Sequence, residues 1–273
     1  NKKKGKINSL IKNLFSIRKE KYDAVLNIQR FFNSGLVTAL SGAKMRIGFD
    51  KNPLSLFFTH KIHHKIPHYI STSPDTQALH EVERNFQLAQ IFISNKYSRE
   101  QLRPQLYFSK DDQEVLNSLD IKDPYVVMAP ASVWYTKQWH INKWKELIES
   151  IPKEIKIYLI GAPNDQSYLS PLMQSDHIIS LCGQLSLRQS ALLMKNAKRV
   201  FANDSAPLHR ASSVNAKTTA IFCSTIPEFG YGPLSEDSKL IQVAPRLECM
   251  PCGLHGKKQC PLIHFDCSHK IDT

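Results

Sequence analysis

The second half of the sequence alternates between short apolar runs and segments with helical periodicity. The apolar runs predict strands near Tyr125–Ala129, Ile155–Ile160, Ile178–Leu181, Arg199–Ala202, Thr218–Phe222 and Leu240–Val243. Helices are predicted near Asn142–Ser150, Gln166–Met173 and Leu187–Asn196. Parallel strands need a long crossover connection, which a helix usually supplies. The alternation therefore predicts an α/β fold with a mostly parallel sheet wrapped by helices.

The segment Val200–Ala211 reads as a buried strand that runs directly into a helix. Asp204 is predicted to be the N-cap of that helix, and Pro207 is predicted to lie in its first turn. The unpaired N–H groups around Ser205 and Ala206 would then face an anion such as phosphate, with the positive end of the helix dipole behind them. An ordinary strand-to-helix turn is the alternative, because capped helix starts are common in α/β proteins.

The segment from Tyr125 to Trp139 reads as a second strand followed by a polar loop, and a helix is predicted after it. The hydroxyl groups of Ser132 and Thr136 can hydrogen-bond phosphate oxygens, and Lys137 can stabilise a departing diphosphate. The alternative for Lys137 is a solvated loop cation. Ligands bind at the carboxyl ends of the strands in doubly wound sheets, so we expect the two segments to converge on one nucleotide.

These two segments resemble the paired signatures of glycosyltransferase family 9, the lipopolysaccharide heptosyltransferases. The family writes them approximately as P-G-S-x-W-x-T-K-x-W and N-D-S-G-P-M-H-L-A, and the matching segments here are Pro130–Trp139 and Asn203–Ala211, in the same order. Further similar segments are Tyr22–Gln29, Ser41–Asp50, His80–Arg84 and the cysteine-bearing tail. The resemblance covers nearly the whole chain.

The resemblance implies a GT-B fold, in which two Rossmann-like domains with mostly parallel sheets face each other across a cleft. It also implies transfer of a heptose from ADP-heptose to the lipid A–Kdo inner core of lipopolysaccharide, with inversion and with no metal or other cofactor. A lysine and a helix N-terminus can together neutralise a leaving diphosphate in place of a magnesium ion.

Roles for individual residues follow from the same resemblance. Lys137 and Asp204 are the expected catalytic residues: Lys137 meets the diphosphate, and Asp204 holds sugar hydroxyls or orients Lys137. His209 would brace the phosphate site. The expected donor-binding set is Ser132, Thr136, Lys137, Asn164, Asp165, Asp204, Ser205, Ala206 and His209. Two positions depart from the family's pattern, because Ala206 stands where it prefers glycine and Arg210 where it prefers an apolar residue.

The resemblance also implies that part of the N-terminal domain is missing before Asn1. The family's opening strand, its S-x-G-D loop and the following strand–helix unit would amount to on the order of sixty residues. The family's proposed general base, an aspartate, lies in that loop. We therefore expect an incomplete N-terminal domain and name no general base in this chain.

The first part of the sequence predicts a smaller α/β domain. Strands are predicted near Tyr22–Gln29 and Met45–Phe49, and a helix across Asp75–Ile93 with Val82, Phe86, Ala89 and Phe92 or Ile93 facing inward. A short helix is predicted to follow Ser109 and to end near Leu119. We place the domain boundary near Lys122. This gives a partial, acceptor-side domain over 1–122 and a nucleotide-sugar-binding domain with a cysteine-rich tail over 123–273.

Two more loops follow predicted strands, Gly161–Asp165 and Ser224–Glu228. By analogy with the family they would line the adenine and the ribose. Asn164 or Asp165 could accept hydrogen bonds from ribose hydroxyls. Plain surface turns are the alternative, because both loops are rich in turn-forming residues.

The net charge of +12 indicates an anionic partner, such as nucleic acid, acidic lipid or an anionic sugar. Much of the charge lies in the first 21 residues, where Leu10, Ile11, Leu14 and Ile17 recur at helical spacing. A basic amphipathic helix can lie on an anionic membrane, but a helix packed on the sheet before Tyr22 is the alternative. The sequence holds no apolar run of the ~20 residues that a membrane span needs, and it holds neither G-x-G-x-x-G nor a Walker loop.

The cysteines fall into two groups. Cys182 and Cys223 are predicted core residues. Four tail cysteines near several histidines could hold a structural zinc, namely Cys249, Cys252, Cys260 and Cys267. The alternative is reduced thiols in a tail folded back over the first domain. A second cluster, His60, His63, His64 and His68, lies among lysines, which favours a basic loop beside an anionic acceptor over a metal site.

The sequence thus predicts an inverting, metal-independent heptosyltransferase-like enzyme. Its expected partners are a nucleotide-sugar donor, an anionic lipopolysaccharide-precursor acceptor and the membrane surface, with no nucleic acid, and its expected place is the cytoplasmic side of the inner membrane. One alternative is a related transferase that uses another nucleotide sugar. The alternative of another class is a basic nucleic-acid-binding module with a Cys/His zinc tail, whose binding would fall steeply with salt.

Overall fold

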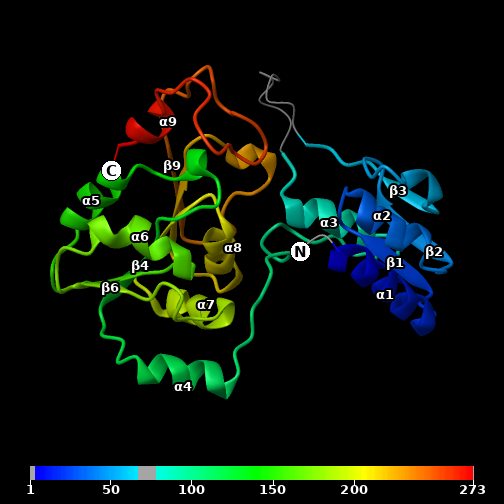
Figure 1. The fold of residues 1–273 in the computed structure, drawn as a ribbon, viewed down its shortest axis with the longest axis horizontal. Coiled ribbons are helices and arrows are strands. Elements are labelled where there is room, and N and C mark those ends of the chain that lie inside the picture. Colours follow the sequence, from blue (N-terminus) through cyan, green and yellow to red (C-terminus); the bar gives the residue numbers. More distant parts are fainter. Residues whose placement is uncertain (1–3, 67–77, 273) are drawn as a thin grey trace. The chain divides into compact units, whose positions relative to one another are not determined.

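The computed structural model describes residues 4–66 and 78–272 (Figure 1). These residues form two compact units, the first from residues 4–66 and 81–98 and the second from residues 78–80 and 99–272. Each unit contains its own parallel sheet. The expected α/β class with parallel sheets is confirmed.

The first unit has a three-stranded sheet in the order β1-β2-β3. The strands are β1 (Ala24–Asn27), β2 (Met45–Phe49) and β3 (His60–Ile62). The other elements are α1 (Lys4–Glu20), α2 (Phe32–Ala39), the 3-10 turn η1 (Ser55–Phe57) and α3 (Glu81–Ala89). The small core is formed by Ile47, Phe49 and Leu88. Both strands predicted for this part of the chain are therefore confirmed.

The predicted helix across Asp75–Ile93 is shorter in the structure. Residues 75–77 lie outside the described residues, and α3 ends at Ala89. Its buried side chains are those of Arg84 and Leu88, whereas Phe92 is 53% exposed. The expectation that Phe92 or Ile93 faces inward is wrong, because the chain leaves the helix before it reaches them.

The basic helix α1 is joined to α2 by a hydrogen bond that Arg18 donates to the carbonyl oxygen of Leu40, at 3.2 Å. Phe15 is 69% exposed, so an apolar part of α1 faces away from its unit. In the histidine cluster, His63 Nδ1 lies 2.6 Å from Asp50 Oδ2, and His64 is buried against the ring of Phe49. His68 lies outside the described residues. Part of the segment that was expected to be a basic loop is therefore packed against its own unit, at His64.

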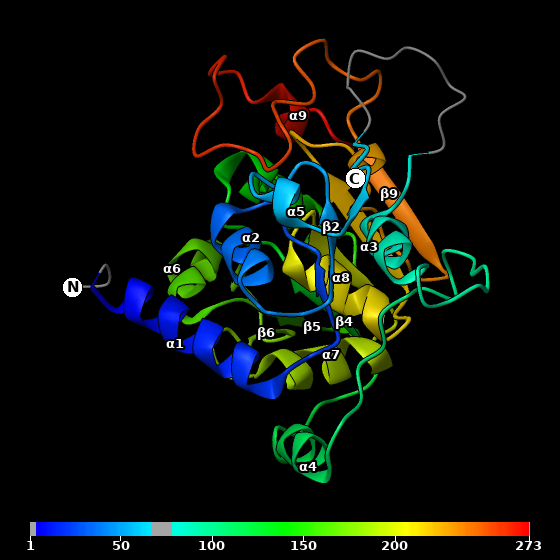
Figure 2. The ribbon, with the colours of Figure 1, turned by 90° about the vertical axis from the view of Figure 1, so that its right-hand side faces the viewer.

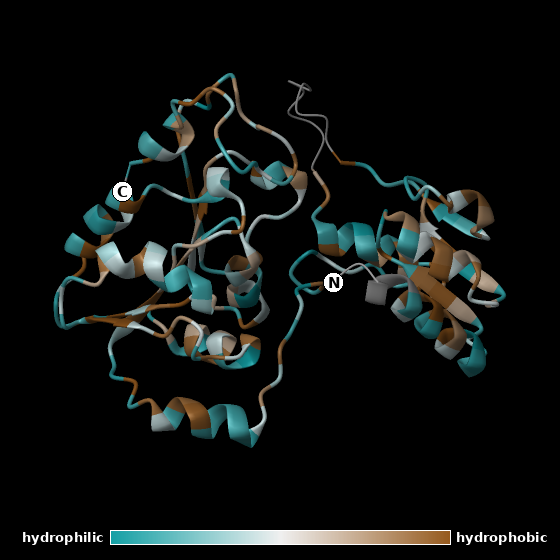
Figure 3. Cartoon of the chain, in the orientation of Figure 1, coloured by the Kyte–Doolittle hydropathy of each residue, from teal (hydrophilic) through white to brown (hydrophobic). Residues whose placement is uncertain are grey.

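The second unit has a six-stranded parallel sheet in the order β6-β5-β4-β7-β8-β9. All six predicted strands are confirmed. They are β4 (Tyr125–Ala129), β5 (Lys156–Leu159), β6 (Ile178–Ser180), β7 (Val200–Asn203), β8 (Thr218–Phe222) and β9 (Ser238–Gln242). Every residue of β4 and of β8 is buried, as expected for strands covered on both faces. Hydrophobic residues predominate in these strands (Figure 3).

Helices cover both faces of this sheet (Figure 1). On one face lie α4 (Lys110–Ser118), α7 (Leu187–Asn196) and α8 (Ala206–Ser213). On the other face lie α5 (Ile141–Glu149) and α6 (Gln166–Leu169). The helix predicted over Gln166–Met173 is replaced by α6 and the 3-10 turn η4 (Ser170–Leu172). Pro171, which has no N–H to donate, explains why the α-helix stops.

The division between the units differs from the boundary expected near Lys122, because residues 99–122 belong to the second unit. Leu116 of α4 is buried in the second core, together with Tyr125. The buried carboxylate of Asp112 lies 3.1 Å from Arg188 of α7. These contacts fix α4 to the second unit.

The tail after β9 packs on the second unit and ends in α9 (Asp266–His269), near α5 (Figure 2). Phe265, Cys267 and Ile271 are buried in the core that also contains Trp144. The rings of His140 and His269 lie 4.2 Å apart. The expectation that the tail folds over the first domain is wrong, because its apolar residues are buried on the second. Within the described ranges, no helix is both long and apolar enough to cross a membrane.

Candidate active site

The two signature segments meet at the centre of the second sheet. The strand order places β4 beside β7, and β5 and β8 lie on opposite sides of this pair, so the chain direction across the sheet reverses here. A crevice outside the carboxyl ends of the strands is the usual ligand site at such a switch point. The loop after β4 leads into the 3-10 turn η2 (Tyr135–Lys137), and the loop after β7 leads into α8.

Asn203, at the end of β7, ties the two segments together. Its Oδ1 accepts a hydrogen bond from the N–H of Trp139 at 3.1 Å, and its Nδ2 donates to the carbonyl oxygen of Pro130 at 2.6 Å. Asn203 is completely buried. The two segments therefore lie together, through a contact that sequence reasoning did not find, and their convergence on one nucleotide stays a prediction. The sequence signal that could have indicated this role is an asparagine at the end of a predicted buried strand.

Lys137 and Asp204 form the charged centre of the site. Lys137 Nζ lies 2.6 Å from Asp204 Oδ2, and the two side chains are only 13% and 5% exposed. Thr225, after β8, donates a hydrogen bond to the same Oδ2 at 2.6 Å. Lys137 is thus held by a buried carboxylate, and the alternative of a solvated loop cation is wrong. Thr225 is a further site residue that sequence reasoning missed.

Asp204 is not the N-cap of α8. The N-cap is Ser205, in an extended conformation and with no capping hydrogen bond from its side chain, and Pro207 lies in the first turn as expected. The carboxylate of Asp204 binds Lys137 and Thr225 and is therefore directed away from the cap position. The start of α8 has no side-chain cap among the described contacts, so the N–H groups of Ser205 and Ala206 can donate to a ligand.

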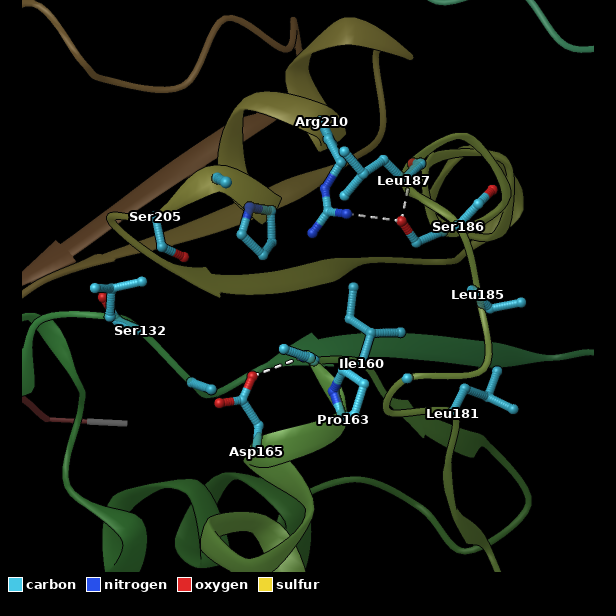
Figure 4. A pocket seen from close by; sticks show the side chains of 18 residues that line it. Ser132, Ile160, Pro163, Asp165, Leu181, Leu185, Ser186, Leu187, Ser205 and Arg210 are labelled. Carbon is cyan, nitrogen blue, oxygen red and sulfur yellow. Dashed lines mark hydrogen bonds between the residues drawn. The ribbon is translucent and has the colours of Figure 1, made fainter. Parts of the chain in front are cut away.

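A cavity of about 510 Å³ opens at the carboxyl ends of β4, β5, β6 and β7 (Figure 4). The apolar part of its wall includes Ile160, Leu181, Leu185 and Leu187. Of the expected donor-binding residues, those that line it are Ser132, Asp165, Ser205 and Ala206. Asp204 directly precedes the lining residue Ser205, so the charged centre adjoins the cavity. The size suits a nucleotide-sized ligand.

The two residues expected near the ribose differ in position. Asp165 lies on the cavity wall, where its Oδ2 accepts a hydrogen bond from the N–H of Ala162 at 2.7 Å (Figure 4). Asn164 is exposed and is not among the described lining residues. Of the two residues that the sequence offered for the ribose, the structure therefore favours Asp165 over Asn164.

Thr136 has a different environment from the one expected of a phosphate ligand. Its Oγ1 accepts hydrogen bonds from the N–H of Lys257 at 2.7 Å and from Ser224 Oγ at 2.9 Å. The residue is 1% exposed. These contacts join the β4 loop to the tail and to the loop after β8. Ser224 and Thr225 are both buried, so this part of the Ser224–Glu228 loop supports the site and does not line the cavity.

His209 is the fourth residue of α8, and its ring centroid lies 6.4 Å from that of Tyr231. The imidazole keeps an exposed edge, but the protein around it still lowers its pKa by desolvation. Asp204 opposes this lowering of the pKa, and Lys137 adds to it. Both groups of the charged centre thus act on His209 electrostatically, and its bracing role stays a prediction.

The four tail cysteines surround a separate cavity of about 290 Å³, which His264 also lines. All four are reduced. Among the residues that the structure describes, no three His, Cys, Asp or Glu side chains are arranged to hold a metal ion. The zinc site has no geometric support in the described residues, and it stays an untested prediction.

Burial raises the pKa of the Cys267 thiol to about 12, and the nearby Cys252, Cys249 and Cys260 add to the rise in pKa. We expect native Cys267 to react with iodoacetamide at pH 8 on the order of 10³-fold more slowly than in the unfolded chain, because the thiolate is the nucleophile. Time-resolved labelling with peptide mass spectrometry, with and without denaturant, measures this ratio. Equal rates would show that the tail is not packed as described.

Comparisons with known proteins identify the family of the chain. The sequence profile of glycosyltransferase family 9 (heptosyltransferase) matches residues 9–263. Lipopolysaccharide heptosyltransferase 1 of Salmonella typhimurium is 24% identical over 77% of this chain and 65% of its own length. Lipopolysaccharide heptosyltransferase 3 of Escherichia coli is 22% identical over 81% of this chain and 64% of its own length. The chain thus spans slightly less than two thirds of these curated relatives.

Solved structures show the same likeness. The E. coli ADP-heptose lipopolysaccharide heptosyltransferase II superposes with a TM-score of 0.69 at 20% identity, over 90% of this chain and 78% of that one. An E. coli heptosyltransferase with ADP gives a TM-score of 0.63 at 22% identity, over 85% and 70% of the two chains. At these identities the likeness establishes the fold, which is GT-B-like.

Proposed function

The chain belongs to glycosyltransferase family 9, and on this premise we propose that it transfers a heptose from ADP-heptose to the inner core of a lipopolysaccharide precursor. The transfer inverts the anomeric carbon and needs no metal ion. The observation that carries the proposal is the buried Lys137–Asp204 pair beside a nucleotide-sized cavity at the switch point of the sheet.

The donor lies along the cavity. Its diphosphate meets the uncapped start of α8 and the hydroxyl groups of Ser132 and Ser205, both of which line the cavity. Asp165 accepts hydrogen bonds from the ribose hydroxyls with the oxygen that does not hold Ala162. The apolar wall formed by Ile160, Leu181, Leu185 and Leu187 receives the adenine ring.

In the reaction, a hydroxyl group of the acceptor attacks the anomeric carbon from the face opposite the diphosphate. The new C–O bond forms as the bond from that carbon to the phosphate oxygen breaks, and the hydroxyl proton passes to a base. Negative charge grows on the departing diphosphate. Lys137 and the positive end of α8 stabilise this charge, and Asp204 with Thr225 holds Lys137 in place.

The acceptor is anionic, and the enzyme works at the cytoplasmic face of the inner membrane. The net charge of +12 supports this part of the proposal, because it favours acidic lipid and phosphorylated sugar. The first unit, with its basic helix α1, is the acceptor-side domain, and the second unit binds the nucleotide sugar. The rival reading as a nucleic-acid-binding module has no observation in its favour beyond this charge.

Calorimetric titration with ADP, UDP and GDP, in EDTA and without magnesium, tests the donor assignment. We expect ADP to bind at least tenfold more tightly than UDP or GDP, because the apolar wall receives the adenine ring, whereas Asp165 contacts the ribose that all three nucleotides share. Asp165→Asn should weaken ADP binding about tenfold, which is ~1.4 kcal/mol, while binding of pyrophosphate stays unchanged. Preferred binding of UDP or GDP would support a transferase for another nucleotide sugar, and no binding of any nucleotide would contradict a donor site.

A further inference from the structure

Arg210 lines the donor cavity from the second turn of α8 (Figure 4). Its Nη1 donates a hydrogen bond to Ser190 Oγ of α7 at 3.0 Å. Its Nε is buried and has no hydrogen-bond partner among the described residues. A guanidinium carries five N–H donors, so most of its bonding capacity is unused in the protein. Buried donors are normally satisfied, so the free Nε can donate to a group that enters the cavity.

The surroundings of Arg210 are unfavourable for a cation. Arg210 lies in the last turn of the eight-residue helix α8, and its guanidinium is bonded to Ser190 near the start of α7. The positive end of the α7 dipole is at its N-terminus, where a cation is disfavoured. Burial also lowers the pKa of Arg210, although a guanidinium stays protonated. An anion bound beside the guanidinium would offset this penalty.

The rest of the site does not supply a net positive charge. Lys137 is paired with Asp204 at 2.6 Å, so the charges of this pair cancel. Among the described residues that line the cavity, Arg210 is the only lysine or arginine, and Asp165 is acidic. Arg210 forms no ion pair among the described residues, so a diphosphate meets one unpaired cation in this cavity.

The position of Arg210 on α8 allows it to reach the diphosphate. Side chains of a helix point back toward its N-terminus, so a residue covers the turn that precedes it. Arg210 is four residues after Ala206, and both residues line the cavity. Its side chain thus extends toward the same helix start at which the proposed diphosphate lies. The family's signature favours an apolar residue at this position, so this contact would be a property of this chain.

We propose that Arg210 binds a phosphate oxygen of the donor's diphosphate and supplies a positive charge that, unlike that of Lys137, no ion pair already neutralises. This assignment rests on the proposed function, because it places the diphosphate of a nucleotide sugar in the cavity. It makes Arg210 a determinant of donor affinity and of selectivity for diphosphate over monophosphate.

Two variants test the assignment. Arg210→Leu introduces an apolar residue of the kind that the family favours, and Arg210→Gln removes the charge but keeps an amide that can bond to Ser190. We expect both to weaken ADP binding by about 10- to 100-fold, which is the usual weight of a charge-assisted hydrogen bond. Adenosine binding should be unchanged, and AMP binding should fall less than ADP binding. Lys217→Leu, which removes an exposed cation between α8 and β8, is the matched control and should leave all three affinities unchanged.

The ligand series separates the possible failures. Equal loss of ADP and adenosine binding would assign Arg210 to the base and overturn the phosphate contact. Unchanged ADP binding in both variants would also overturn it. If the unmodified protein binds neither ADP nor adenosine, the proposed function itself fails, and the assignment fails with it.

The melting temperature separates the proposed role from a purely structural one, because the two roles predict opposite changes when Arg210 is replaced. Without ligand, Arg210→Leu should melt at the same temperature as the unmodified protein or higher, because an unpaired, partly buried cation has been removed from beside the start of α7. The rise in melting temperature on adding ADP should be smaller than in the unmodified protein. A lower melting temperature with an unchanged ADP-induced rise would show that Arg210 only joins α8 to α7.

Discussion

Lys137→Ala is expected to lower the rate of sugar transfer by about 10²- to 10³-fold, because it removes the ammonium group that meets the departing diphosphate. The Lys137 ammonium group is already held in position before the substrate binds. Asp204 holds it at 2.6 Å, and the side chain is only 13% exposed, so little water competes for its charge. Charges fixed in a site of this kind stabilise a developing anion more than a mobile surface cation does.

Single-turnover measurement with saturating donor checks this effect, because it isolates the chemical step from donor binding. Lys143→Ala is the matched control: this cation of α5 pairs with Glu146 at 2.8 Å, away from the cavity. The control should retain the full rate. A Lys137→Ala rate within threefold of the unmodified protein would contradict the proposed role of the lysine.

Lys137→Ala also leaves the buried carboxylate of Asp204 without its cation, so stability must be separated from chemistry. Removing one partner of a buried ion pair costs about 3–5 kcal/mol of folding free energy, whereas removing both charges costs much less. We therefore expect the double variant Lys137→Ala, Asp204→Asn to regain most of the lost stability. Its transfer rate should stay low, because the ammonium group is still missing.

Asn203→Ala is expected to reduce the free energy of unfolding of the second unit by about 2–5 kcal/mol. The substitution leaves the N–H of Trp139 and the carbonyl oxygen of Pro130 without their partner, and all of these groups are buried or nearly so. Each unsatisfied buried group contributes about 1–3 kcal/mol to the loss. The β4 loop would also lose its attachment to β7, so donor affinity should fall as well.

Urea unfolding followed by tryptophan fluorescence measures the stability change, because Trp139 and Trp144 are packed against each other in the core. Asn142→Ala is the matched control, since Asn142 is an exposed asparagine of α5 and its loss should change stability by less than ~0.5 kcal/mol. If Asn203→Ala were as stable as the control, the two loops would be held together by other contacts.

Much of the second unit could be predicted from the sequence because its signals are local. An apolar run such as Thr218–Phe222 is too short for a helix and too apolar for an exposed loop, so it indicates a buried strand. Parallel neighbours require crossovers, so the alternation of strands and helices predicts the sheet. Ser132 and Ser205 follow strands of that sheet, and their common position at one cavity follows from it.

The expectations that differed from the structure depended on the direction of a side chain or on distant packing. Asp204 has the residue type and position of an N-cap, but its carboxylate is bound by Lys137 and Thr225 from two other loops. Thr136 resembles a phosphate ligand until the tail brings Lys257 to its hydroxyl group. Residues 99–122 join the second unit because Leu116 and Asp112 find partners there. No local pattern contains these partners.

The sequence by itself determined the strands, the crossovers and the family, because short-range periodicity and the spacing within two motifs are properties of consecutive residues. The tertiary structure alone decided that Asn203 joins the two motifs, that Asp204 neutralises Lys137 and that Arg210 has no ion-pair partner among the described residues. Charge balance at a site depends on which groups from separate strands come within a few ångströms of one another. That is fixed only when the sheet has formed and its loops have packed.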